Sequence, residues 1–142
     1  MCKKLFIILL LMGIGYIAYL KTYSYNIDKA VSFVEENALS RSHTCCAWFV
    51  MRAMNKGGCP IGILPAFGYS QVLPYYGFKE ISKDAEFRKG DIVVFPAVKG
   101  HIYGHIAMYT GRQWVSDFKQ KSFYPAKGYY GSNYKVFRFK NT

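Results

Sequence analysis

Apolar residues recur at helical spacing in two segments of the first half of the chain. The first follows Asn26, a residue type that caps helix N-termini, and predicts a helix to about residue 38. Its apolar positions are Ile27, Ala30, Val31, Val34 and Ala38. The second predicts a helix over residues 46–56, with apolar positions Ala47, Val50, Met51 and Met54. Each helix would bury one face, as helices packed on a sheet do.

The second half of the chain alternates short apolar runs with turn residues. This pattern predicts strands at 78–82, 90–95, 105–110, 114–118 and 134–140, and a short helix at about 66–73. A three-residue turn joins the strands at 105–110 and 114–118 into a hairpin. The expected fold class is therefore α+β, with two or three helices packed on an antiparallel sheet of about five strands.

The N-terminal residues 1–22 have the pattern of an export signal. Lys3 and Lys4 precede an apolar run at 5–20, and Lys21 follows it. The run is slightly shorter than the about 17–25 residues that cross a bilayer comfortably. No small-residue cleavage site lies near Lys21, which favours an uncleaved membrane anchor, but a cleaved signal peptide stays open. Residues 23–142 then form one domain.

A formal net charge of +11 indicates an anionic partner such as nucleic acid, a membrane or a wall polymer. Behind an export signal, a wall polymer or a membrane is favoured. No basic run interleaved with aromatic residues resembles a nucleic-acid module, so we expect no nucleic-acid partner.

The four cysteines, at positions 2, 45, 46 and 59, contain no C-x-x-C pair and do not indicate a disulfide framework. A zinc site is an alternative, disfavoured because adjacent cysteines rarely bind the same ion. Its ligands would be His43, Cys45, Cys46 and His105.

Cys46 is the candidate nucleophile. It lies in or next to the first turn of the second predicted helix, behind the cap-type residues Ser42 and Thr44. There the helix dipole favours the thiolate, which is the nucleophilic form of cysteine.

His105 is the candidate base, because it opens a strand directly after a Gly-rich loop. Asp117 lies twelve residues later, across the hairpin turn, where its carboxylate could hold the imidazole ring. His43 and His101 are expected to be surface residues without a catalytic role.

Three segments resemble motifs of the NlpC/P60 and CHAP peptidoglycan amidases, which are small papain-like cysteine hydrolases. They are CAWFV at 46–50, GDIVVF at 90–95 and GHIAMYTG at 104–111. The segment WVSDF at 114–118 is similar to wall-cleaving amidases delivered as type VI secretion effectors. The resemblance implies a papain-like fold, with Cys46 as nucleophile, His105 as base and Asp117 as the orienting residue. It implies neither a metal nor an organic cofactor.

The expected function is therefore hydrolysis of an amide bond in peptidoglycan stem peptides, in the periplasm or cell envelope. An acyl-enzyme would form on Cys46, whose backbone N–H would be one oxyanion donor. An immunity protein is a possible partner, as is a membrane bound through the N-terminal segment. Two alternatives stay open: a membrane-associated acyltransferase or lipid hydrolase, and an inactive wall-binding module.

Overall fold

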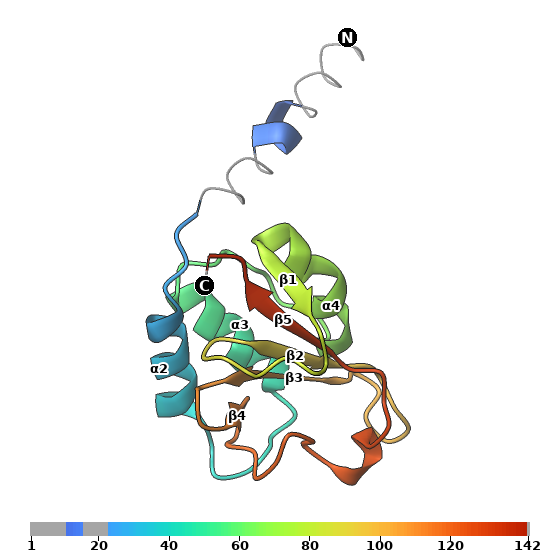
Figure 1. The fold of residues 1–142 in the computed structure, drawn as a ribbon. Helices are drawn as coiled ribbons and strands as arrows, with labels where there is room; N and C mark the ends of the chain where they lie inside the picture. The colour runs from blue at the N-terminus through green and yellow to red at the C-terminus, as the bar shows by residue number, and fades with distance from the viewer. Residues whose placement is uncertain (1–10, 16–22, 142) are drawn as a thin grey trace.

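The computed structural model describes residues 11–15 and 23–141. Residues 23–141 form helices packed against one face of an antiparallel sheet (Figure 1). The helical elements are α2 (Ile27–Asn37), α3 (Cys46–Lys56), η1 (Ala66–Gly68), α4 (Tyr69–Val72), η2 (Leu73–Tyr76) and η3 (Lys127–Tyr129). The strands are β1 (Phe78–Ile81), β2 (Ile92–Phe95), β3 (His105–Tyr109), β4 (Trp114–Val115) and β5 (Lys135–Phe139). The strand order is β1-β5-β2-β3-β4, with every neighbouring pair antiparallel. The predicted α+β class is confirmed.

The two long helices begin and pack largely as their sequences predict. The Asn26 side chain accepts a hydrogen bond from the Lys29 backbone N–H and so caps α2. On α3, Val50 and Met54 are buried as expected. The buried face is shifted, however, because Phe49 and Ala53 are buried while the predicted Ala47 and Met51 are only half-buried.

Both faces of the sheet are covered, which explains why β2 is apolar at every position. Ile92 and Val94 belong to the core between the sheet and the helices. Val93 and Phe95 point to the opposite face, into a second core built mainly of aromatic rings. The chain segment after β4 supplies much of that second core, including Phe123. Alternate residues of a strand face opposite sides, so a strand buried on both sides reads as a continuous apolar run.

The fourth strand is shorter than predicted. The sequence suggested a strand over 114–118, but β4 ends at Val115. The chain then turns tightly, since the Ser116 backbone N–H donates to the Phe118 carbonyl and Val115 forms a bridge with Lys119. This turn decides which side chains reach the candidate site.

The predicted export signal or anchor falls largely outside the described residues. Of residues 1–22, the structure describes only 11–15, which are helical. Within 11–15 and 23–141, no helix is both long and apolar enough to span a bilayer.

Candidate active site

The candidate nucleophile Cys46 is the first residue of α3, and its side chain is 8% exposed. The loop before it is held in an unusual conformation, because Thr44 has a φ of 59°. A β-branched residue rarely adopts this left-handed region. Ser42 and Thr44 do not cap the first turn of α3 as predicted. Instead, the Ser42 hydroxyl accepts a hydrogen bond from the Thr44 backbone N–H, inside the loop itself.

The candidate base His105 begins β3 and is 6% exposed. The loop before it ends at Gly104, with a φ of 68°, where an added Cβ would lie 2.4 Å from the Phe95 carbonyl oxygen. No other residue type fits this close approach, so Gly104 fixes where His105 enters the sheet. Cys46 and His105 line one pocket of about 420 Å³. This volume lies within the range of small-molecule and peptide sites.

The His105 ring is held by Gln120. The distance between His105 Nε2 and Gln120 Oε1 is 2.8 Å. The Gln120 amide nitrogen donates to the carbonyls of Ser122 and Phe123, so Oε1 is the end of the amide that faces the ring. Because an amide oxygen only accepts, Nε2 carries the proton and Nδ1 is left as the basic nitrogen of the neutral imidazole.

Asp117 contacts the other half of the site. Its carboxylate accepts hydrogen bonds from the backbone N–H groups of His43, at 2.7 Å, and Cys45, at 3.2 Å. The hydroxyls of Ser42 and Ser116 also donate to it. Among residues 11–15 and 23–141, the hydrogen-bond partner found on the His105 ring is Gln120, whereas Asp117 was expected there. The tight turn after β4 causes this difference, because it directs Asp117 toward the loop before Cys46.

The electrostatic surroundings favour a neutral thiol and a neutral imidazole. Burial raises the pKa of the Cys46 thiol, and hydrogen bonding with the backbone of Ile106 opposes this only in part. Burial also lowers the pKa of His105 to about 4, against the opposing effects of Gln120 and Asp117. The sequence predicted that the helix dipole would favour the thiolate. In the folded protein, desolvation of the buried sulfur outweighs that effect.

Of the two other histidines and the neighbouring Cys45, only His101 lines the pocket. The His43 ring is exposed, as predicted, and the residue acts through its backbone N–H on Asp117. His101 is exposed but lines the pocket, and it stacks on Tyr129 with ring centroids 4.9 Å apart. The exposed Cys45 thiol donates to the His43 carbonyl, which leaves Cys46 as the cysteine that lines the pocket with His105.

Gln120 is the site residue that sequence reasoning missed. It stands fifteen positions after His105, beyond the hairpin that was expected to close on the ring. The Gln120 backbone N–H donates to the Trp114 carbonyl, which brings the residue back alongside β4. An uncharged polar residue just after the hairpin was the available signal, since an amide oxygen can also accept a hydrogen bond from an imidazole N–H.

The sheet, the helix that begins with a cysteine and the histidine at the start of a central strand define a papain-like α+β domain. The chain belongs to the Tae3 family of type VI secretion effectors. It is 34% identical to a chain in the crystal structure of the native type VI effector–immunity complex Tae3–Tai3 from Ralstonia pickettii, with a TM-score of 0.76. The match covers 81% of this chain and 99% of that one.

A selenomethionine structure of the same complex gives the same identity, with a TM-score of 0.72, over 78% of this chain and 99% of the other. No family model and no curated protein matches the chain. The predicted relationship to type VI effectors is confirmed, while the finer assignment to NlpC/P60 or CHAP stays a prediction.

Proposed function

We propose that this protein is a cysteine amidase that hydrolyses an amide bond in peptidoglycan stem peptides outside the cytoplasmic membrane. The observation that carries the proposal is the shared pocket of Cys46 and His105, with the His105 ring fixed through Nε2 by Gln120. Membership of the Tae3 effector family supports the same conclusion. A nucleophile, a base and a residue that orients the base are the minimum that thiol catalysis requires.

The geometry suggests how the first half of the reaction proceeds. As the Cys46 sulfur attacks the carbonyl carbon of the amide, His105 Nδ1 takes the thiol proton. The carbonyl oxygen becomes an oxyanion, for which the Cys46 backbone N–H at the start of α3 is one donor. The C–N bond breaks as the imidazolium returns its proton to the leaving amine, and a thioester on Cys46 remains.

Water completes the cycle. His105 Nδ1 takes a proton from water as the water oxygen attacks the thioester carbonyl. The C–S bond then breaks as the imidazolium returns that proton to the departing sulfur, which releases a carboxylic acid and restores the thiol. Because both groups start neutral, charge separation occurs during each step and not before substrate binds.

Asp117 serves this reaction in a different way from the one the sequence suggested. Its carboxylate organises the loop before Cys46 through the backbone N–H groups of His43 and Cys45. Its negative charge also raises the pKa of His105, and therefore stabilises the imidazolium that forms during each half-reaction. We assign Asp117 a positioning and electrostatic role, and Gln120 the role of orienting the ring.

The solved relatives are effector–immunity complexes. We therefore propose that an immunity protein inhibits this chain and that its site of action is the periplasm. The assignment of residues 1–22 as a signal peptide or membrane anchor remains a prediction from the sequence.

The decisive experiment is digestion of purified sacculi, with the products identified by mass spectrometry. Wild-type protein should release stem-peptide fragments with one defined new carboxyl terminus and one new amine. The Cys46→Ala variant should release none, and the matched Cys45→Ala variant should retain activity. Release of fatty acid from phospholipid vesicles instead would identify a lipid hydrolase. Sacculus binding without cleavage by any form would identify a wall-binding module.

A further inference from the structure

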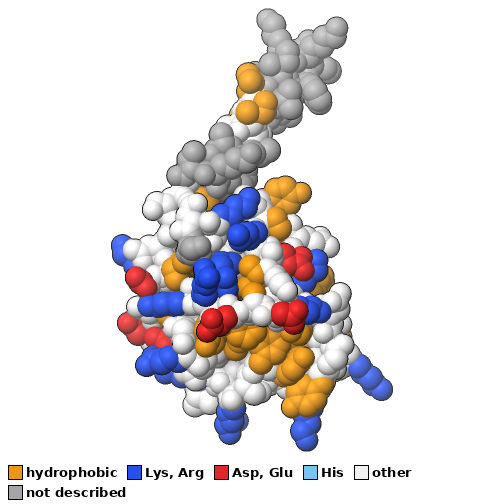
Figure 2. All heavy atoms as spheres, viewed as in Figure 1, with side chains coloured by type: hydrophobic (Ala, Val, Ile, Leu, Met, Phe, Trp, Pro, Cys, Tyr) orange, Lys and Arg blue, Asp and Glu red, His pale blue; other side chains and the backbone are white. Residues whose placement is uncertain are grey.

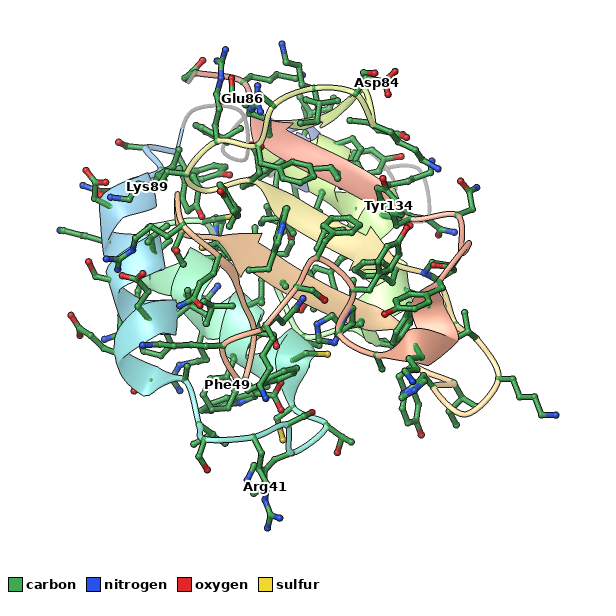
Figure 3. All side chains as sticks on the ribbon, turned by 60° about the horizontal axis from the view of Figure 1, so that its bottom comes forward. Arg41, Phe49, Asp84, Glu86, Lys89 and Tyr134 are labelled. Atoms are coloured by element: carbon green, nitrogen blue, oxygen red, sulfur yellow. The ribbon has the colours of Figure 1, made fainter. Side chains whose placement is uncertain are left out.

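Four exposed basic residues are next in sequence to residues that line the pocket of Cys46 and His105. We call them the basic rim: Arg41, Lys99, Lys119 and Lys127. Each is the immediate sequence neighbour of a residue that lines the pocket, namely Ser42, Gly100, Phe118 and Ala126. Figure 3 shows Arg41 projecting into solvent from the loop that precedes α3.

The rim residues form no ion pair with an acidic residue in the described part of the chain. Within 11–15 and 23–141, the ion pairs are Lys89–Asp28, Arg112–Glu35, Lys135–Glu80 and Arg138–Asp91, and none includes a rim residue. From residue 92 onward the sequence contains one acidic residue, Asp117, which is 0% exposed. In Figure 2, basic side chains project from the lower edge of the molecule without acidic ones beside them. The rim charges therefore have no ion-pair partner among these described residues, and the acidic group that acts on Cys46 and His105 is the buried Asp117.

This charge acts on the pocket itself. The Cα atom of each rim residue is about 3.8 Å from that of a pocket-lining residue. Because Lys and Arg side chains are long and flexible, a carboxylate at the pocket mouth is within their reach. The N-terminus of α3, where Cys46 lies, adds positive potential from the same side. No Asp or Glu lines the pocket. A ligand with carboxylate groups on both sides of its scissile bond fits this field.

We propose that the basic rim binds carboxylate groups of the substrate and makes the site select stem peptides with free carboxylates over those with carboxamides. This inference rests on the proposed function and adds the chemical class of stem peptide that the site takes. The alternative occupant of the rim is an acidic face of a partner protein. The position of the rim favours the substrate, because its residues flank the pocket that holds the nucleophile.

Two synthetic stem peptides test the proposal, one with free side-chain carboxylates and one with carboxamides at the same positions. For wild-type protein, kcat/KM should favour the acidic peptide by about tenfold at low salt, and the preference should shrink as salt screens the rim. A rim variant should lose most of the preference at every salt concentration. This variant is Lys99→Gln, Lys119→Gln and Lys127→Gln combined.

A matched control removes the same number of positive charges from exposed positions that do not flank the pocket. It combines Lys29→Gln, Lys79→Gln and Lys140→Gln. This control should keep the wild-type preference. The proposal would be overturned if the rim variant and the wild type showed the same preference for the acidic peptide. It would also be overturned if kcat/KM for the two peptides depended equally on salt. In that case the basic rim would be assigned to binding a partner protein.

A binding measurement separates this inference from the proposed function. The Cys46→Ala variant is titrated with each uncleaved peptide by calorimetry, with and without the rim substitutions. The affinity for the acidic peptide should fall when salt is added and when the rim substitutions are present. This result would support carboxylate binding by the basic rim even if wild-type protein cleaves neither peptide. Cleavage of both peptides by wild-type protein, together with equal affinity of the Cys46→Ala variant for the two peptides, would support the amidase activity. It would overturn the proposed selectivity of the basic rim for carboxylates.

Discussion

Two buried aspartates in this fold are equally hidden from solvent but are stabilised in opposite ways. Asp91, just before β2, is 0% exposed and binds both Nε and a terminal nitrogen of Arg138 at 2.8 Å. Asp117 is also 0% exposed, yet its partners are the backbone N–H groups of His43 and Cys45 and two hydroxyls.

The difference determines what each charge does. The guanidinium of Arg138 neutralises the charge of Asp91, and the pair joins β5 to the start of β2. The dipoles around Asp117 stabilise its charge without cancelling it. That charge raises the pKa of both Cys46 and His105. A buried carboxylate thus acts on its surroundings only where no cation neutralises it.

Breaking the ion pair between Arg138 and Asp91 should have the largest effect, which is on stability. In Arg138→Met, the Asp91 carboxylate stays buried without a cation, and the free energy of unfolding should fall by about 3–5 kcal/mol. Urea unfolding measures this change. The control is Arg112→Met, which removes an exposed ion pair with Glu35 and should cost at most about 1 kcal/mol. Similar losses in the two variants would show that Asp91 does not depend on its cation.

Replacing Asp117 by Asn should mainly reduce turnover. The substitution keeps an acceptor oxygen but removes the charge that stabilises the His105 imidazolium, so kcat should fall by about tenfold or more. The pKa of His105 should fall further below its wild-type value of about 4. Asp91→Asn is the control, and it should lower stability while the folded enzyme keeps its kcat. Equal kcat values for the two variants would remove the distinction between the two carboxylates.

A charge placed on the other side of His105 should shift its titration. In Gln120→Glu, the new carboxylate faces Nε2 and raises the pKa of His105, by about one pH unit. His105 must be neutral to accept a proton, so activity is lost as pH falls through its pKa. The acid limb of the kcat/KM profile should therefore move to higher pH. Gln120→Leu should lower kcat without that shift, and an unmoved limb in Gln120→Glu would exclude Gln120 as the partner of the ring.

The smallest expected effect is at Thr44. Thr44→Gly relieves the left-handed backbone strain but adds unfolded-state entropy, so the free energy of unfolding should rise by only about 0.5 kcal/mol. The gain should be smaller in an Asp117→Ala background, where the loop loses its hydrogen bonds to the carboxylate and can relax. Ser42→Gly is the matched control and should show no such gain. Additive effects of Thr44→Gly and Asp117→Ala would mean that Asp117 does not hold the strained loop.

The elements that sequence analysis predicted well are those whose burial pattern is local. The helix from Cys46 and the strand from His105 follow from the spacing of apolar residues and from Gly104, and the two residues share a pocket as their chain order suggested. The position of Asp117 depends instead on where the ladder between β3 and β4 stops. It stops at Val115, and the tight turn that follows directs Asp117 away from the ring, so that Gln120 takes the place expected of Asp117. Apolar periodicity carries no information about such a turn.

The placement of β5 has a consequence for how the chain folds. β5 is the last strand described, yet it lies between β1 and β2, so the two earlier strands cannot be joined until it arrives. Before that, β1 and β2 each present an unpaired edge, and Asp91 lacks Arg138. Folding of the sheet therefore waits for long-range contacts made by the end of the described chain, which slows it relative to local pairing. Shortening the chain by a few residues within β5 should abolish the native state, whereas the hairpin formed by β2 and β3 would remain able to pair.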